Sequence, residues 1–255
     1  MQSKKVLLEV KGSVATVTLN RPERLNALDG DVWLGLEEAA REIKFNPDIN
    51  VVIVTGAGRA FSAGLDLKAA ASPEGISFNL PLREGIETLQ YVSSIFSLYE
   101  ALPVPVIAAI GGACMGAGME VALACDIRIA SDDAIFSIPE VVYGLVPDCG
   151  GTQRLPRIVG PGYAKELVLT GRRIDAAEAL RIGLVNHVYP VNELMDEAGK
   201  MASEIAGLSQ EAVQASKRAL NFALSSSMET GLIYETAAAE RVLGDRAKDV
   251  FKKKE

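Results

Sequence analysis

Three carboxylates lie among apolar residues, where acid–base chemistry is favoured. Glu120 interrupts the apolar stretch of residues 115–125, Glu140 lies in a second apolar stretch, and Asp148 follows eight residues later. When neighbouring acids lose solvation and repel one another, their pKa values separate, so one acid stays protonated near neutral pH while another is ionised. Such a set can give and take protons without a histidine.

Each carboxylate also has a structural interpretation. The two glutamates could form buried ion pairs with Arg128 or Arg154. Asp148 could be the N-cap of a helix that begins near residues 150–152. Both interpretations stay open beside the catalytic one.

The sequence contains one histidine, His187. Serine and cysteine hydrolases need a histidine as general base, and most catalytic zinc sites use one to three. A hydrolase built on Ser62 would need His187 beside it in space, but we expect His187 at a strand edge in a structural role. The sequence therefore predicts carboxylate chemistry and no metal site.

Composition excludes several other classes. The 255 residues carry a net charge of −7, which argues against nucleic acid as a partner, although a few local cations can still hold a small anion. The three cysteines form no CxxC pair and predict free thiols in a cytoplasmic protein. We expect no signal peptide, and no apolar stretch long enough to span a membrane.

The elements that must position these acids follow from hydrophobic periodicity. Residues 14–19 alternate like a half-buried strand, and the apolar stretches 51–54 and 106–110 predict strands covered on both faces. Asp29 and Asp175 are predicted helix N-caps. Further helices are predicted at residues 83–99, 191–206, 209–224 and 227–243. This gives an α/β core over residues 1–190 and a helical region over residues 191–255.

Two of the buried strands run into segments of small residues, at 56–67 and 111–121. Small residues let backbone N–H groups approach a ligand, and two such turns that converge would form an oxyanion hole. The glycines could equally serve only tight strand-to-helix turns. Neither segment is a phosphate or dinucleotide motif, so a nucleotide-binding dehydrogenase is weakly supported.

In these residues the chain resembles the crotonase superfamily, the enoyl-CoA hydratases and isomerases, over essentially its whole length. The motifs that carry the resemblance are NRPERLNAL at 20–28, AFSAGLDLK at 60–68, and the stretches 111–130 and 139–160. The resemblance implies a spiral of repeated ββα units with a helical C-terminal trimerisation region. It also implies a homotrimer or homohexamer that acts in fatty acid metabolism on an acyl thioester of coenzyme A, with no separate cofactor.

The resemblance also assigns site residues. It implies an oxyanion hole formed by the backbone N–H groups of Leu65 and Ala117, and a pair of glutamates, Glu120 and Glu140, that hold the attacking water. Many relatives have glycine where this chain has Ala117, and a main-chain donor tolerates alanine if its backbone angles are ordinary. Residues implied to line the coenzyme A site are Arg24, Leu25, Ala27, Ala63, Asp66, Leu67, Lys68, Gly116, Phe251 and Lys254.

The activity that these residues imply is an enoyl-CoA hydratase, which adds water across the 2,3 double bond. Asp148 departs from the pattern of many hydratases and matches an acid of dienoyl-CoA isomerases. A double-bond isomerase or a cyclic dienoyl-CoA hydratase that uses Glu140 and Asp148 is therefore the alternative. A third hypothesis, RNA binding on the same scaffold, would need a basic face, for which the charge balance leaves little room. We expect residues 69–81 to shape the acyl pocket, for which the sequence predicts no chain length.

Overall fold

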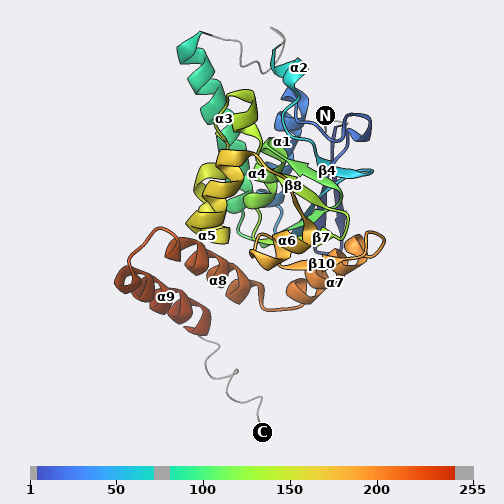
Figure 1. Ribbon diagram of the computed structural model, residues 1–255. Coiled ribbons are helices and arrows are strands. Elements are labelled where there is room, and N and C mark those ends of the chain that lie inside the picture. Colours follow the sequence, from blue (N-terminus) through green and yellow to red (C-terminus); the bar gives the residue numbers. More distant parts are fainter. Residues whose placement is uncertain (1–4, 72–80, 245–255) are drawn as a thin grey trace.

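The computed structural model describes residues 5–71 and 81–244 (Figure 1). Within them, two strands followed by a helix recur along the chain, which gives the predicted α/β spiral of ββα units. The recurring elements are β1 (Val6–Lys11), β2 (Val14–Leu19) and α1 (Gly30–Phe45); β3 (Val51–Gly56), β4 (Ala60–Ser62) and α3 (Leu82–Glu100); β5 (Val106–Ile110), β6 (Ala113–Met115) and α4 (Ala117–Leu123); and β7 (Ile127–Ser131), β8 (Ile135–Ser137) and α5 (Gly151–Thr170).

Shorter elements and the C-terminal helices complete the described chain. The short ones are η1 (Pro22–Arg24), α2 (Leu67–Ala70), η2 (Glu140–Tyr143), β9 (Ile174–Asp175), α6 (Ala176–Arg181) and β10 (His187–Tyr189). The last three helices are α7 (Leu194–Ala206), α8 (Gln210–Ala223) and α9 (Met228–Leu243). The predicted C-terminal helices are therefore confirmed to within about three residues at their ends.

The second, third and fourth units send their first and second strands to two different sheets, whereas β1 and β2 of the first unit both lie in the larger sheet. The six-stranded sheet has the order β1-β2-β3-β5-β7-β10 and is parallel apart from the β1–β2 hairpin. The second sheet has the order β4-β6-β8-β9. Because β4 and β6 are parallel neighbours, the turns that follow them lie beside each other at one end of the smaller sheet.

The central strands β3 and β5 of the large sheet are buried on both faces, as their apolar sequences predict. Val51 and Ile53 of β3 pack with Leu194 of α7 in one apolar cluster, whereas Val52 and Val54 point into the main core on the other side. This alternation is what a period of two residues imposes on a strand covered by helices.

Helix ends follow local sequence signals. Asp29 accepts a hydrogen bond from Val32 N at 3.1 Å, and Asp175 accepts one from Glu178 N at 2.8 Å. Both predicted N-caps are therefore confirmed. Side-chain caps of this kind satisfy N–H groups that the first helical turn leaves without a partner.

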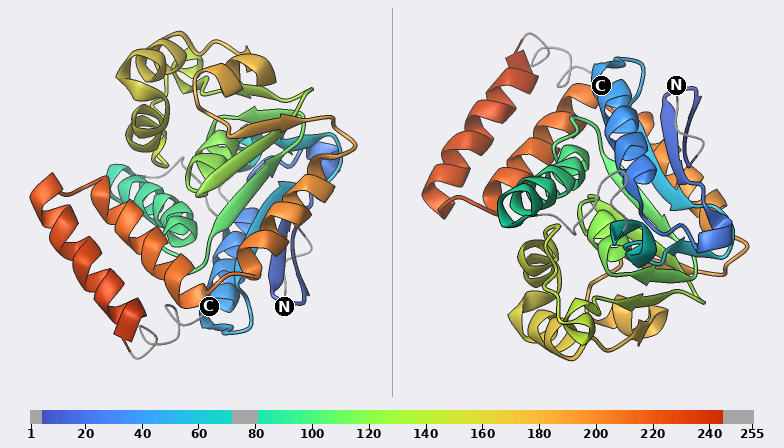
Figure 2. Two further views of the ribbon diagram at one scale, coloured as in Figure 1. Left: turned by 90° about the horizontal axis from the view of Figure 1, so that it is seen from below. Right: turned by 90° about the horizontal axis from the view of Figure 1, so that it is seen from above.

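Helices α8 and α9 lie side by side at the margin of the fold, next to the end of α3 (Figure 2). One buried cation ties α8 to the core, since Lys217 Nζ lies 2.7 Å from Asp126 Oδ2 and donates to Val104 O at 3.0 Å. Asn221 adds a bond to Glu100 O. None of the helices in the described ranges is long and apolar enough to cross a membrane.

Two expectations about organisation stay predictions. The boundary at residue 190 is one, and α7, just beyond it, packs on the six-stranded sheet. The proposed acyl-pocket segment at 69–81 is the other, because residues 72–80 lie outside the described chain.

Candidate active site

The turns after β4 and β6 pack directly against each other. A Cβ placed on Gly64 would lie 2.6 Å from Met115 O and 3.4 Å from Ala117 N, and a Cβ on Gly118 would lie 2.5 Å from Ser62 Cβ. Only glycine permits such close backbone approach, and Gly64 also has a positive φ of 88°. The glycines therefore do more than turn the chain, because they bring the two turns into contact.

This contact places two backbone donors in one region. Among the described residues, neither Leu65 N–H nor Ala117 N–H has a hydrogen-bond acceptor. Ala117 is the first residue of α4 and does not have a positive φ. Its backbone angles are therefore ordinary, and alanine can replace glycine as the main-chain donor at this position. The pair can donate to one oxygen that carries negative charge.

Glu120 projects from α4 into the interior, where it is 1% exposed. Its Oε1 accepts hydrogen bonds from Gly151 N at 2.7 Å and Cys149 N at 3.0 Å. Burial raises the pKa of Glu120 to about 7, against the lowering effect of the Gly151 N–H, and the nearby charges of Glu140 and Asp148 add to the rise. A carboxyl with this pKa can act as a base near neutral pH.

Glu140 begins η2 and lies against the turn that precedes α4. A Cβ on Gly116 would lie 2.7 Å from Glu140 Oε1, so the carboxyl occupies the space that a side chain there would need. Its Oε2 is buried and has no partner among the described residues. Burial raises the pKa of the Glu140 carboxyl, and the charge of Asp148 raises it further. An unpartnered buried oxygen beside two free N–H donors is a site for a substrate or water.

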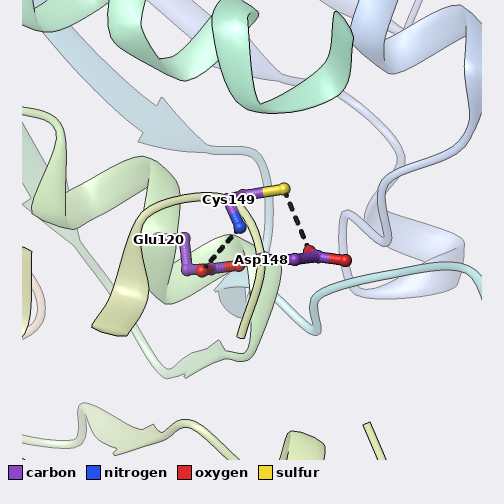
Figure 3. A group of neighbouring side chains, drawn as sticks. All are labelled: Glu120, Asp148 and Cys149. Carbon is purple, nitrogen blue, oxygen red and sulfur yellow. Dashed lines mark hydrogen bonds between the residues drawn. The ribbon is translucent and has the colours of Figure 1, made fainter. Parts of the chain in front are cut away.

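Asp148 lies beside Glu120 and Cys149, as Figure 3 shows. One carboxylate oxygen each of Glu120 and Asp148 and the Cys149 sulfur lie within 4.8 Å of one another, and the Cys149 thiol donates to Asp148 Oδ1 at 3.4 Å. Although Asp148 is exposed, surrounding chain desolvates its carboxyl and raises its pKa. The three predicted acids are thus brought together.

The same group offers three atoms that metals bind, but its chemistry does not favour a cation. Burial raises the pKa of the Cys149 thiol, and the charges of Glu120 and Asp148 raise it further, so the thiolate that a metal needs is disfavoured. Oε1 of Glu120 is also already occupied by two N–H donors.

The alternative structural roles of the acids are not found in the structure. Helix α5 has Gly150 as its N-cap with no side-chain cap bond, so Asp148 does not cap it; Glu120 accepts the Gly151 N–H instead. The alternative ion pairs of the glutamates with Arg128 or Arg154 are also absent from the described residues. Arg128 donates to the carbonyls of residues 125 and 184, and Arg154 pairs with Glu100.

The two segments proposed to hold coenzyme A lie side by side. Ala63 N donates to Leu25 O at 2.8 Å, and Leu28 pairs with Leu65 in a parallel bridge. Exposed residues here are Arg24, Ala63, Leu67 and Lys68, while Leu25, Ala27 and Asp66 are half-buried. The Asp66 side chain is taken up by Ala69 N and Arg21, so it serves the fold. Phe251 and Lys254 lie outside the described residues.

Ser62 and His187 do not support a hydrolase. Ser62 is fully buried, where its hydroxyl donates to Asn26 O and accepts from Gly64 N. His187 lies on β10, the edge strand of the large sheet, as predicted. The serine, which sequence reasoning weighed only as a nucleophile, instead holds the turn that carries Leu65 N–H.

Two sheets built from ββα units, with helices at the C-terminal end, define the crotonase class of fold. Residues 9–247 match the enoyl-CoA hydratase/isomerase family model. The chain belongs to the enoyl-CoA hydratase/isomerase family.

Individual relatives match nearly the whole chain. It is 42% identical to a short-chain-enoyl-CoA hydratase of Clostridium acetobutylicum, over 93% of this chain and 89% of the relative. It is 39% identical to a crotonyl-CoA hydratase of Syntrophomonas wolfei, with the same coverage. The crystal structure of an enoyl-CoA hydratase from Bacillus anthracis superimposes with a TM-score of 0.90 at 37% identity, over 98% of this chain and 96% of that one.

Proposed function

We propose that this protein is an enoyl-CoA hydratase, a hydro-lyase that converts a 2-enoyl-CoA thioester to the 3-hydroxyacyl-CoA. The observation that carries the proposal is the placement of the buried Glu120 and the half-buried Glu140, whose Oε2 is buried, beside the turns that carry two backbone N–H groups without acceptors in the described chain. The hydratases among its relatives support a short acyl chain as substrate.

In this mechanism the thioester oxygen accepts hydrogen bonds from Leu65 N–H and Ala117 N–H. As water attacks Cβ, negative charge moves through Cα to this oxygen and gives an enolate-like transition state. Fixed donors stabilise that charge without reorganising. The positive end of the α4 dipole lies at Ala117, but this helix has only seven residues, so the two N–H groups carry most of the effect.

The two glutamates divide the proton transfers. Glu120, whose Oε1 is held by two N–H donors, keeps Oε2 free of them, and in its ionised form it positions water and takes a proton from it. Glu140 has the leading acid–base role and in its protonated form delivers the proton to Cα. Its unpartnered Oε2 supports this assignment. Hydroxide is thus added to Cβ and a proton to Cα, and the proton taken up by Glu120 returns to Glu140 through solvent, which restores both groups for the next turnover.

Asp148 favours a second candidate, a dienoyl-CoA isomerase or cyclic dienoyl-CoA hydratase, because its carboxyl joins the same cluster. Glu120→Gln and Asp148→Asn separate the two on enoyl- and dienoyl-CoA substrates. A hydratase loses turnover with Glu120→Gln and keeps most of it with Asp148→Asn. The reverse pattern favours the isomerase.

The direct test is turnover of a panel of enoyl- and dienoyl-CoA thioesters in isotopic water. We expect heavy oxygen from the solvent in the 3-hydroxy group of the product, together with one solvent hydrogen at Cα. Mass spectrometry of the product acyl group measures both labels. Hydrogen exchange without oxygen incorporation would identify an isomerase and overturn the hydratase assignment.

A second expectation concerns pH. Because burial raises the pKa of Glu120 to about 7 and the base must be ionised, kcat/KM for hydration falls as the pH drops below about 7. The residual activity of Glu120→Gln lacks this acid limb, since the titrating group is gone. Initial rates measured from about pH 5 to 9 test this. A wild-type profile that stays flat through pH 6 would contradict the role of Glu120.

Assembly and location are further parts of the proposal. Apolar side chains stay exposed on α8 and α9, including Leu220, Met228 and Ile233, which supports contact with other copies in a homotrimer or a dimer of trimers. The exposed Arg24 and Lys68 beside the paired coenzyme A segments support an anionic ligand. The three cysteines are free and buried, which fits the reducing cytoplasm.

A further inference from the structure

Arg154 in the first turns of α5 joins α3 to the loop that carries Asp148. Its Nε and Nη2 donate to Glu100 Oε2 at 3.0 and 2.8 Å, and Nη2 also donates to Ser97 Oγ at 3.1 Å. The remaining Nη1 donates to Cys149 O at 2.9 Å. The side chain of Arg154 is only 14% exposed, whereas its partner Glu100 is 41% exposed, so the guanidinium is the shielded half of this ion pair.

The carbonyl that Arg154 holds belongs to the peptide between residues 149 and 150. The peptide on either side of it donates its N–H to Glu120 Oε1, through Cys149 N at 3.0 Å and Gly151 N at 2.7 Å. One guanidinium therefore anchors the middle of a three-peptide cradle around the catalytic carboxyl.

Gly150 is a second observation that links the cradle to Arg154, because only glycine leaves room there for the guanidinium. A Cβ on Gly150 would lie 1.9 Å from Arg154 Nη1, and the residue has a positive φ of 103°. The absence of a side chain thus lets the guanidinium fold back over the loop and reach the Cys149 carbonyl.

We propose that Arg154 is a positioning residue for Glu120, which it holds through the peptides of residues 149–151 while Glu100 fixes the guanidinium. This proposal rests on the proposed function, since it assigns how the base of that reaction is kept in place. Arg154 itself touches no reacting atom and acts only through the backbone.

Loss of the Nη1 bond frees the loop and weakens both N–H bonds to Glu120. Those bonds stabilise the ionised carboxylate against burial, so the pKa of Glu120 rises when they weaken. In Arg154→Gln the acid limb of kcat/KM moves to higher pH, and kcat falls by on the order of 10- to 100-fold because the base is less well placed. KM changes little, since residues 149–151 lie outside the segments proposed to hold coenzyme A.

Arg157→Gln is the matched control. Arg157 lies one turn later on the same helix, is exposed, and also donates its Nη1 to a backbone carbonyl, that of Gln153. It contacts no part of the cradle. This variant keeps the wild-type pH profile and kcat. An equal shift in both variants would overturn the proposal, because it would show a general effect on α5.

Infrared difference spectra report on Glu120 without turnover. Subtracting Glu120→Gln from wild type isolates the carboxyl band of Glu120, and its loss with rising pH gives the titration directly. In an Arg154→Gln background the band persists to higher pH. If wild type fails to hydrate enoyl-CoA, the proposed function fails while this readout still tests the cradle. An unshifted band in the folded variant overturns the role of Arg154.

Two milder variants cover the case in which Arg154→Gln does not fold. Glu100→Gln keeps an acceptor for the guanidinium but removes its charge, and Glu100 lies at a partly exposed site. Arg154→Lys keeps the charge but cannot reach Glu100 and Cys149 together with a forked donor. Both shift the acid limb in the same direction as Arg154→Gln, by less. A wild-type profile in both overturns the proposal.

Discussion

Glu140→Gln lowers kcat for enoyl-CoA hydration by on the order of 100- to 10000-fold, the range typical of a lost general acid–base group. The amide has the shape of the carboxyl and fits the same space against Gly116, but it has no acidic proton to deliver to Cα. We expect KM to change little, because the oxyanion donors and the coenzyme A segments are untouched. Steady-state kinetics across a substrate titration separate kcat from KM.

A surface glutamate provides the control for this variant. Glu166 on α5 pairs with Arg172 and has a side chain that is 48% exposed, so Glu166→Gln keeps wild-type kinetics. The loss in Glu140→Gln is also expected at every pH, unlike the acid limb attributed to Glu120. A Glu140→Gln enzyme with wild-type kcat would remove Glu140 from the mechanism.

Gly64→Ala lowers kcat by on the order of 100- to 1000-fold, as expected when an oxyanion donor is displaced. The new Cβ would lie 2.6 Å from Met115 O, so the turn that carries Leu65 N–H must move away from the turn that carries Ala117 N–H. The positive φ of 88° adds strain for any side chain. The two donors then no longer meet one oxygen. Single-turnover rates with saturating substrate measure the effect on the chemical step.

Gly12→Ala separates backbone strain from the loss of the oxyanion hole. Gly12 has a positive φ of 60° in the turn between β1 and β2, and a Cβ there meets nothing within 4 Å. Both alanine variants therefore lose stability of about 1 kcal/mol from the left-handed conformation alone. Thermal unfolding measures this shared cost. If Gly12→Ala also lost the chemical step, the effect of Gly64→Ala could not be assigned to the turn.

Much of the fold follows from local patterns. The apolar stretches at 51–54 and 106–110 predict strands buried on both faces, because alternate residues must meet helices on opposite sides. Asp29 and Asp175 predict helix starts through a hydrogen bond that spans three residues. The caps have partners three residues away, and the burial of each strand follows from its own consecutive apolar residues, so these short segments contain the information.

Partners distant in sequence could not be predicted in this way. The acids of the site can be predicted because they are charged residues in apolar stretches. The partners of Glu120 could not be predicted in this way, because they are backbone N–H groups about 30 residues away and every residue type except proline has one. The sequence offers Arg154 as one possible ion-pair partner of the buried glutamates, but α3 brings Glu100 to it from 54 positions earlier. Cys149 gave no signal, because a lone cysteine looks the same in a core and in a site.

Glu120 also supports the start of a helix that is not its own. Because it satisfies the first N–H of α5, truncation to alanine would leave two buried N–H groups without acceptors, at about 1–3 kcal/mol each. Folding and catalysis are therefore constrained by one oxygen atom. Evolution or engineering toward another reaction can discard the proton chemistry here only if the replacement still accepts both bonds, so glutamine is the permissible first step and most other residues carry a penalty in stability.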